Sequence, residues 1–163
     1  EGRPLSLEYV FSLEEFPDFH SGYKLFSRET AKAVFLNEPQ QMGVSDTCYY
    51  RHACEAVMVV EAIASGAYFG VVNRSTFNEQ PISTFGLYNR IQLAADKMIW
   101  ACKRLAIPVP FVKQWLANHI PRLLLHTLAP DGKAELEEIR QVVMTTLVGE
   151  DVQTEPLFEP LFI

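Results

Sequence analysis

The chain has 163 residues, of which 48% are apolar and 21% are charged, and its formal net charge is −6. This length and composition indicate one globular domain and exclude a disordered chain. The negative net charge also excludes a protein that binds nucleic acid through overall basic character. The three cysteines are too few, and odd in number, for a disulfide framework, which predicts reduced thiols and a cytoplasmic location.

The first expected elements are an irregular N-terminal segment over residues 1–26 and a short helix after it. Within the segment, alternating apolar residues from Leu5 to Phe11 predict one short strand. Ser27 is typical of a helix N-cap, and Asn37 lies just ahead of a proline. We therefore expect a helix that starts after Ser27 and ends by Asn37.

A second helix is expected over residues 46–69. From Ala53 onward it is apolar on nearly every side, which predicts that it is the central and most buried element. The apolar run 53–72 is about as long as a membrane span, but Glu55 and Glu61 lie inside it. Each carboxylate would cost roughly 2.5–3.5 kcal/mol at the centre of a bilayer, so we expect a buried helix of a soluble protein and no membrane partner.

The next helix, over residues 84–105, follows a polar loop at 73–83 and has the clearest periodicity of the chain. Apolar residues recur at alternating steps of three and four, which predicts a seam of coiled-coil type against one long neighbour. The seam consists of Tyr88, Ile91, Ala95, Met98, Cys102 and Leu105.

Two further helical regions complete the expected domain. Residues 110–128 form a kinked helix or two short ones, because Pro121 interrupts them. Asp131 is expected to cap the last helix, which ends at Gly149 in the C′ position. These elements predict an all-α fold, a bundle of about five helices over residues 27–149, with an extended C-terminal tail over 150–163.

Cys48 and His52 lie four residues apart on an expected helix, with Glu55 one turn further on. Together with Cys102, His119 or His126 they could complete a zinc site, and Cys48 near a helix start could be a thiol nucleophile of lowered pKa. The sequence contains no recognisable second half of a metal site and no oxyanion or phosphate-binding motif. We therefore expect no metal and no cofactor, and a metal- or thiol-dependent enzyme is only the third hypothesis.

Glu55 and Glu61 interrupt the apolar helix and require an explanation, because a buried carboxylate must be paired or protonated. The simpler interpretation places each at the helix surface or next to an arginine such as Arg51 or Arg74. The functional alternative is a ligand-binding or regulatory pocket near both carboxylates, lined also by Tyr49 and Tyr50.

The charge is distributed unevenly along the chain. Residues 84–126 contain six basic residues against one acidic residue, whereas the segments on both sides are acidic. Arg90, Lys97 and Arg104, here called the basic stripe, are seven residues apart and therefore roughly 10 Å from one another on a helix. Leu93 and Trp100 fall on the same stripe, which predicts an exposed aromatic side chain among the charges.

A basic row of this kind can contact a phosphate backbone or an acidic protein surface. The alternative is a solvated face paired with the acidic segments of the same chain. The residues expected to contact nucleic acid or an acidic partner are Arg90, Lys97, Trp100, Arg104, Lys113 and Arg122.

The tail contains a tandem repeat, Glu155-Pro-Leu-Phe158 followed by Glu159-Pro-Leu-Phe162. Proline at every fourth position favours an extended course. The apolar side chains either fold back onto the core or dock into pockets of a partner. The candidate docking residues are Leu157, Phe158, Leu161 and Phe162.

The leading hypothesis is a non-enzymatic helical interaction subunit or domain of a larger assembly, with nucleic acid as a possible component. In architecture alone, a small helical domain with one basic face resembles subunits that line a groove in nucleoprotein machines, the small subunits of CRISPR interference complexes among them. The alternative hypothesis is the ligand-binding domain with its pocket near Glu55 and Glu61.

Overall fold

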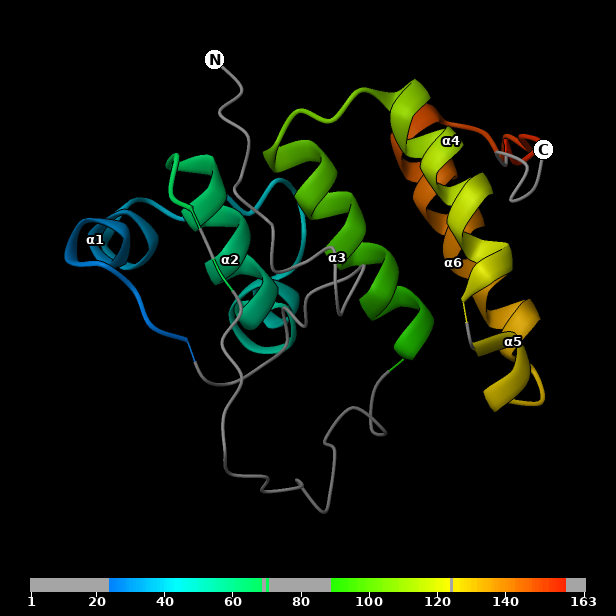
Figure 1. Ribbon diagram of the computed structural model, residues 1–163, viewed down its shortest axis with the longest axis horizontal. Helices are drawn as coiled ribbons and strands as arrows, with labels where there is room; N and C mark the ends of the chain where they lie inside the picture. The colour runs from blue at the N-terminus through cyan, green and yellow to red at the C-terminus, as the bar shows by residue number, and fades with distance from the viewer. Residues whose placement is uncertain (1–23, 69, 71–88, 124, 158–163) are drawn as a thin grey trace.

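The structure is a computed structural model that describes residues 24–68, 70, 89–123 and 125–157. Every regular element in these ranges is a helix, which confirms the all-α fold (Figure 1). The expected strand at Leu5–Phe11 and the loop at 73–83 lie outside the described residues. The α-helices are α1 (Arg28–Leu36), α2 (Cys54–Ala64), α3 (Arg90–Arg104), α4 (Val109–His119), α5 (Leu125–Leu128) and α6 (Gly132–Val148), with a π-helical turn η1 (Cys48–His52) and a 3-10 turn η3 (Ile120–Arg122).

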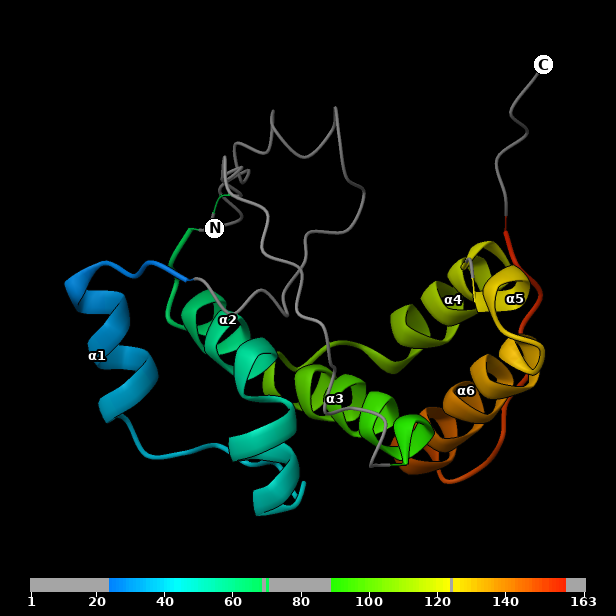
Figure 2. The ribbon, with the colours of Figure 1, turned by 90° about the horizontal axis from the view of Figure 1, so that it is seen from below.

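Helix α3 is the central element of the fold. It lies between α2 on one side and the α4–α6 layer on the other, with α1 beyond α2 at one end of the molecule (Figures 1 and 2). Its residues contribute to two separate core clusters. Ala95 and Ile99 belong to the cluster with α4 and α6, and Leu93 and Trp100 belong to the cluster with η1 and α2.

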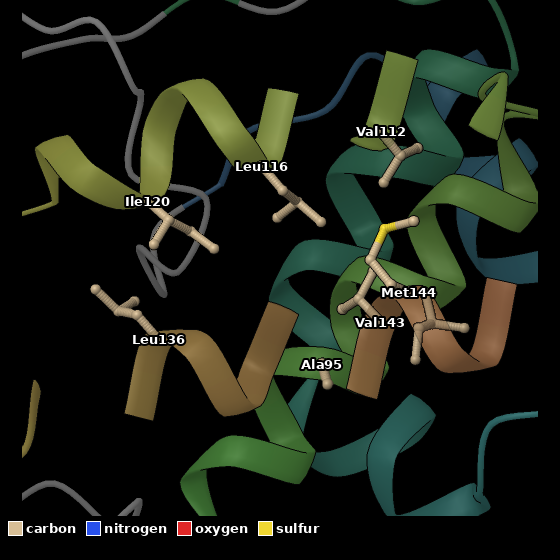
Figure 3. Packing of buried hydrophobic residues seen from close by; sticks show 8 residues of the cluster. Ala95, Val112, Leu116, Ile120, Leu136, Val143 and Met144 are labelled. Carbon is tan, nitrogen blue, oxygen red and sulfur yellow. The ribbon is translucent and has the colours of Figure 1, made fainter. Parts of the chain in front are cut away.

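The larger cluster fills the space between α3, α4 and α6. Leu116 and Ile120 project toward α6, where Leu136 points back at them, and Val143 and Met144 close the other end (Figure 3). Val143 and Ala95 are completely buried, at 0% exposure. Half of the six residues of the seam expected on 84–105 pack here, namely Ala95, Met98 and Cys102, while Leu105 packs on the other cluster. Tyr88 lies outside the described residues.

The expectation of one continuous, central helix over 46–69 is wrong. The segment is divided at Ala53 into η1 and α2, and it lies to one side of α3 (Figure 1). Helix α2 ends at Ala64 because Gly66 adopts φ +81°, and the N–H groups of Gly66 and Ala67 donate to Ile63 and Ala62. This pair of hydrogen bonds is the Schellman motif, which satisfies carbonyl groups that the helix end leaves free.

Helix α1 begins where the sequence predicts. The Ser27 hydroxyl accepts a hydrogen bond from the Thr30 N–H at 3.1 Å, and Asn37 follows the last helical residue. None of the residues of α1 is buried, and Phe35 packs edge-on against Phe26 with ring centroids 5.5 Å apart. Helix α1 therefore rests on α2 as an exposed outer helix.

The region after α3 confirms the interruption expected at Pro121, where η3 separates α4 from α5. Gly149 ends α6 in the left-handed region at φ +92°, again as the sequence predicts. Asp131 occupies the N-cap position of α6, but its side chain accepts no capping hydrogen bond there, so that detail of the prediction is wrong. The first turn is closed through the backbone instead, because the Glu135 N–H donates to the Asp131 carbonyl at 2.9 Å.

The tail has no regular secondary structure over residues 151–157, as expected for its composition. Arg140 of α6 binds the start of the tail. Its guanidinium donates hydrogen bonds to the Asp151 carboxylate at 2.7 Å and to the Val152 carbonyl at 3.2 Å. Hydrogen bonding to Arg140 lowers the pKa of the Asp151 carboxyl and raises that of the guanidinium. Val152 packs against the larger cluster, so this part of the tail folds back onto the core.

Candidate functional site

Arg104, the last residue of the basic stripe, forms an ion pair within the chain. The Arg104 guanidinium donates to both oxygens of Glu61, from Nε at 2.8 Å and from Nη2 at 2.7 Å. The two side chains are only 25% and 11% exposed, and this bidentate hydrogen bonding raises the pKa of Arg104. The pair joins α3 to α2, so Glu61 meets an arginine as the simpler interpretation expects, and that arginine is Arg104. Arg74 lies outside the described residues.

The other two members of the stripe also face their own chain. Arg90 forms an ion pair with Glu135 of α6 at 2.9 Å. Lys97 is half-buried, and burial lowers its pKa, although nearby Cys48 and Glu55 oppose the change. The alternative in which the basic segment pairs with acidic residues of the same chain therefore holds for Arg90 and Arg104.

Trp100 corrects the expectation of an exposed aromatic side chain on this stripe. It is 1% exposed, and its indole Nε1 donates to the Gln40 carbonyl at 2.7 Å. The ring of Tyr49 packs against it edge-on, with centroids 5.7 Å apart, and Leu93 is also buried. The prediction failed because α3 has neighbours on two faces, whereas a seam of coiled-coil type requires only one.

Lys113 and Arg122, the remaining basic candidates, lie on other elements. Lys113 is partly exposed on α4, and Arg122 is exposed at the end of η3. Their contact with nucleic acid or an acidic partner stays a prediction, separate from the stripe on α3.

Replacing Arg104 with methionine is expected to lower the free energy of unfolding by about 2 kcal/mol, because it leaves the nearly buried Glu61 carboxylate without its donors. Lys103→Met, at the adjacent exposed position, is the matched control and should change it by less than about 0.5 kcal/mol. Urea unfolding followed by circular dichroism measures both. Equal stability of the two variants would show that Arg104 does not hold Glu61.

Among the residues considered for metal binding or thiol chemistry, those whose side chains the structure describes are not brought together; the side chain of His52 lies outside the description. Cys48 packs in the cluster with α2, whereas Cys102 packs against the cluster with α6. His119 Nδ1 lies 2.8 Å from the Trp115 carbonyl oxygen, and His126 Nε2 lies 2.8 Å from that of Ile120. In the described ranges, no group of three or more His, Cys, Asp or Glu side chains is arranged to hold a metal ion.

The pKa of Cys48 moves in the direction opposite to that expected of a nucleophile. Burial is the main cause that raises it, and the charge of Asp96 adds to the effect. Burial also raises the pKa of Cys102. Because the thiolate is the reactive species, these environments suppress thiol reactivity.

A pocket lies between α1 and α2, on the side of the molecule away from the tail. Its volume is about 210 Å³, and its lining is mainly apolar. Helix α1 contributes Ala33, Val34 and Phe35, and η1 contributes Tyr49 and Tyr50. The rest of the lining consists of Asn37, Glu38, Pro39, Cys54, Val57, Met58 and Glu61.

The π-helical turn positions the two tyrosines differently. Tyr49 is buried under the pocket against Trp100, while Tyr50 is 56% exposed at its edge, with the two rings edge-on and 4.9 Å apart. Turns of π-helix occur often at functional sites, since they redirect side chains within a helix. Tyr49, Tyr50 and Glu61 were expected to line a pocket, and they do, whereas Glu55 does not.

Compared with protein-family models, with curated proteins and with solved structures, the chain has no match in any of the three comparisons. Among the helices described, none is long and apolar enough to cross a membrane.

Proposed function

We propose that this chain is a non-enzymatic helical interaction module of a larger assembly, which binds an apolar side chain of a partner polypeptide in the α1–α2 pocket. The observation that carries the proposal is the pocket with its exposed apolar rim. Phe35 and Tyr50 are 57% and 56% exposed there. Leu36 of the same helix is 77% exposed.

The volume of the pocket favours a side chain over a larger ligand. Sites for drug-sized molecules and cofactors usually occupy about 300–1,000 Å³. An apolar cavity of about 150 Å³ accommodates benzene, so 210 Å³ suits one aromatic or aliphatic anchor. Anchors of this kind, buried in a pocket, supply much of the affinity at protein interfaces.

The charges at the pocket indicate what lies next to that anchor. The Glu61 carboxylate is neutralised by Arg104, whereas Glu38 is exposed on the rim. We therefore propose a partner segment with a Phe, Leu or Met anchor and a basic residue beside it. The basic stripe is not the contact surface in this proposal, because Arg104 is largely buried against Glu61 and Trp100 is buried in the core.

The tail is the second contact surface of the proposed module. Leu157, the first of the docking residues in the repeat, is 69% exposed. Phe158, Leu161 and Phe162 lie outside the described residues. The exposed Leu157 supports a docking role for the repeat, and the described part of the tail lies at the end of the molecule opposite α1 (Figure 2).

A photo-activatable benzoylphenylalanine in place of Tyr50 tests the proposal in cells that contain the native partners. We expect a cross-link to a polypeptide that disappears when Ala33→Trp fills the pocket. The matched control is Lys32→Trp, on the same helix but outside the lining, which should leave the cross-link unchanged. A cross-link that survives Ala33→Trp would contradict docking in this pocket.

A second candidate function is binding of a small apolar ligand in the same pocket, favoured by the enclosed Tyr49 and the Glu61 carboxylate at its wall. Native mass spectrometry distinguishes it from the first. We would then expect a small molecule that the wild-type protein retains and Ala33→Trp loses, and no polypeptide cross-link from position 50. This result would favour a ligand-binding domain over the interaction module.

A further inference from the structure

Two side-chain amides of α4 hold the backbone of the tail. Gln114 Nε2 donates to the Glu155 carbonyl at 3.1 Å, and the Leu157 N–H donates to Asn118 Oδ1 at 2.7 Å. The two amides also contact each other, since Gln114 Nε2 donates to Asn118 Oδ1 at 2.9 Å. The tail is thus held through backbone atoms of alternate residues.

The spacing of the two amides matches an extended peptide. Residues four apart on an α-helix are separated by about 6 Å along its axis. Residues two apart in an extended chain are separated by about 6.5 Å. Pro156 stands between the two held residues, and it has no N–H that would need a partner.

The contacts do not depend on the side chain of Leu157. That side chain is 69% exposed, while the N–H of the same residue is bound to Asn118. The amides therefore select a sequence only through its backbone, and any Glu-Pro-Leu segment presents the same carbonyl and the same N–H.

The sequence supplies a second such segment four residues later, with Glu159, Pro160 and Leu161 in the places of Glu155, Pro156 and Leu157. We propose that Gln114 and Asn118 form a peptide-backbone clamp that binds either repeat, so that the tail is held in two alternative registers four residues apart. Upstream, Arg140 keeps Asp151 and Val152 fixed to α6 in both registers. The chain after Val152 takes up the difference in length.

The two registers differ in which apolar residues are held close to α4. In the first, Leu157 lies at the clamp. In the second, Leu161 takes that place. The clamp binds the tail of its own chain, so it does not depend on the proposed function.

Proline substitutions in the full-length chain test the clamp, because proline removes the N–H that Asn118 binds and leaves the rest of the tail in place. The side-chain amide signals of Gln114 and Asn118 are followed by NMR and assigned by their loss in Gln114→Ala and Asn118→Ala. We expect Leu157→Pro and Leu161→Pro each to keep both signals at bound positions. The double variant Leu157→Pro/Leu161→Pro should shift both to free positions.

The double variant Leu157→Ala/Leu161→Ala is the matched control, since it removes the same side chains and keeps both N–H groups. Its signals should stay at bound positions, and release in this variant would show that side chains hold the tail. Release in Leu157→Pro alone would overturn the second register. Unchanged signals in the double proline variant would overturn the clamp itself.

Discussion

Replacing Trp100 with alanine is expected to lower the free energy of unfolding by about 3–5 kcal/mol, the range for large aromatic residues removed from a core. The indole is 1% exposed and packs with Tyr49 and the other residues of the cluster between α2 and α3. Its loss opens a cavity at the junction of η1, α2 and α3. Chemical unfolding followed by circular dichroism measures the effect without relying on the fluorescence of the removed residue.

Trp100→Phe separates packing from hydrogen bonding. It keeps an aromatic ring but removes the donor for the Gln40 carbonyl. We expect the lost hydrogen bond to lower the free energy of unfolding by about 1–2 kcal/mol. The smaller ring adds a further loss, and the total should stay below that of Trp100→Ala. A side chain on an exposed face would instead change stability by less than about 0.5 kcal/mol. A loss of that small size in Trp100→Ala would restore the interpretation of Trp100 as a surface contact residue.

Local signals in the sequence predicted some of the helix ends, although α3 begins at Arg90 and not at residue 84. Ser27 caps α1 through its own hydroxyl, and Gly149 ends α6 with the left-handed conformation that glycine favours. Pro121 divides the region after α4, because proline cannot continue a helix without losing a hydrogen bond. Each of these features is decided by residues close together in the chain.

The segment 46–69 contains one local signal of this kind. Gly66 is the residue that ends α2, and a glycine just after an apolar helix is a common C-terminal signal. The division at Ala53 has no comparable signal in the sequence. A continuous apolar pattern predicts a helix equally well on both sides of such a break.

The candidate site depended on contacts between residues far apart in the chain. Periodicity placed Arg104 correctly on one stripe of a helix, but its partner Glu61 is 43 residues away. The wall of the pocket that α1 provides was missed for the same reason. Spacing along one helix shows which side chains share a face, and it does not show what packs against that face.

Replacing Gly132 with alanine is the second change from which we expect a large loss of stability. Gly132 is the buried first residue of α6, where α5 and α6 meet. A Cβ atom at this position would overlap the carbonyl oxygen of Leu125 and lie 2.5 Å from its carbonyl carbon. Because these are backbone atoms of α5, no side-chain rotation can relieve the contact.

Two effects of opposite sign act at Gly132. Alanine favours a helix over glycine by roughly 0.5–1 kcal/mol, whereas overpacking of a well-filled site costs about 1–3 kcal/mol. Since the contact is with backbone, we expect the second to prevail and the free energy of unfolding to fall by about 2 kcal/mol. Hydrogen exchange should show the loss first in residues 125–132, because α5 must move away from α6.

Gly149→Ala is the matched control at the other end of α6. Among the described residues, none beyond its neighbours in the chain comes within 4 Å of a Cβ at this position, so the cost comes only from the left-handed backbone at φ +92°, about 1–2 kcal/mol. The control should therefore leave exchange at 125–132 unchanged. If Gly132→Ala were as stable as the wild-type protein or more so, the helix preference of alanine would have prevailed, and α5 could not approach the start of α6 as closely as the structure shows.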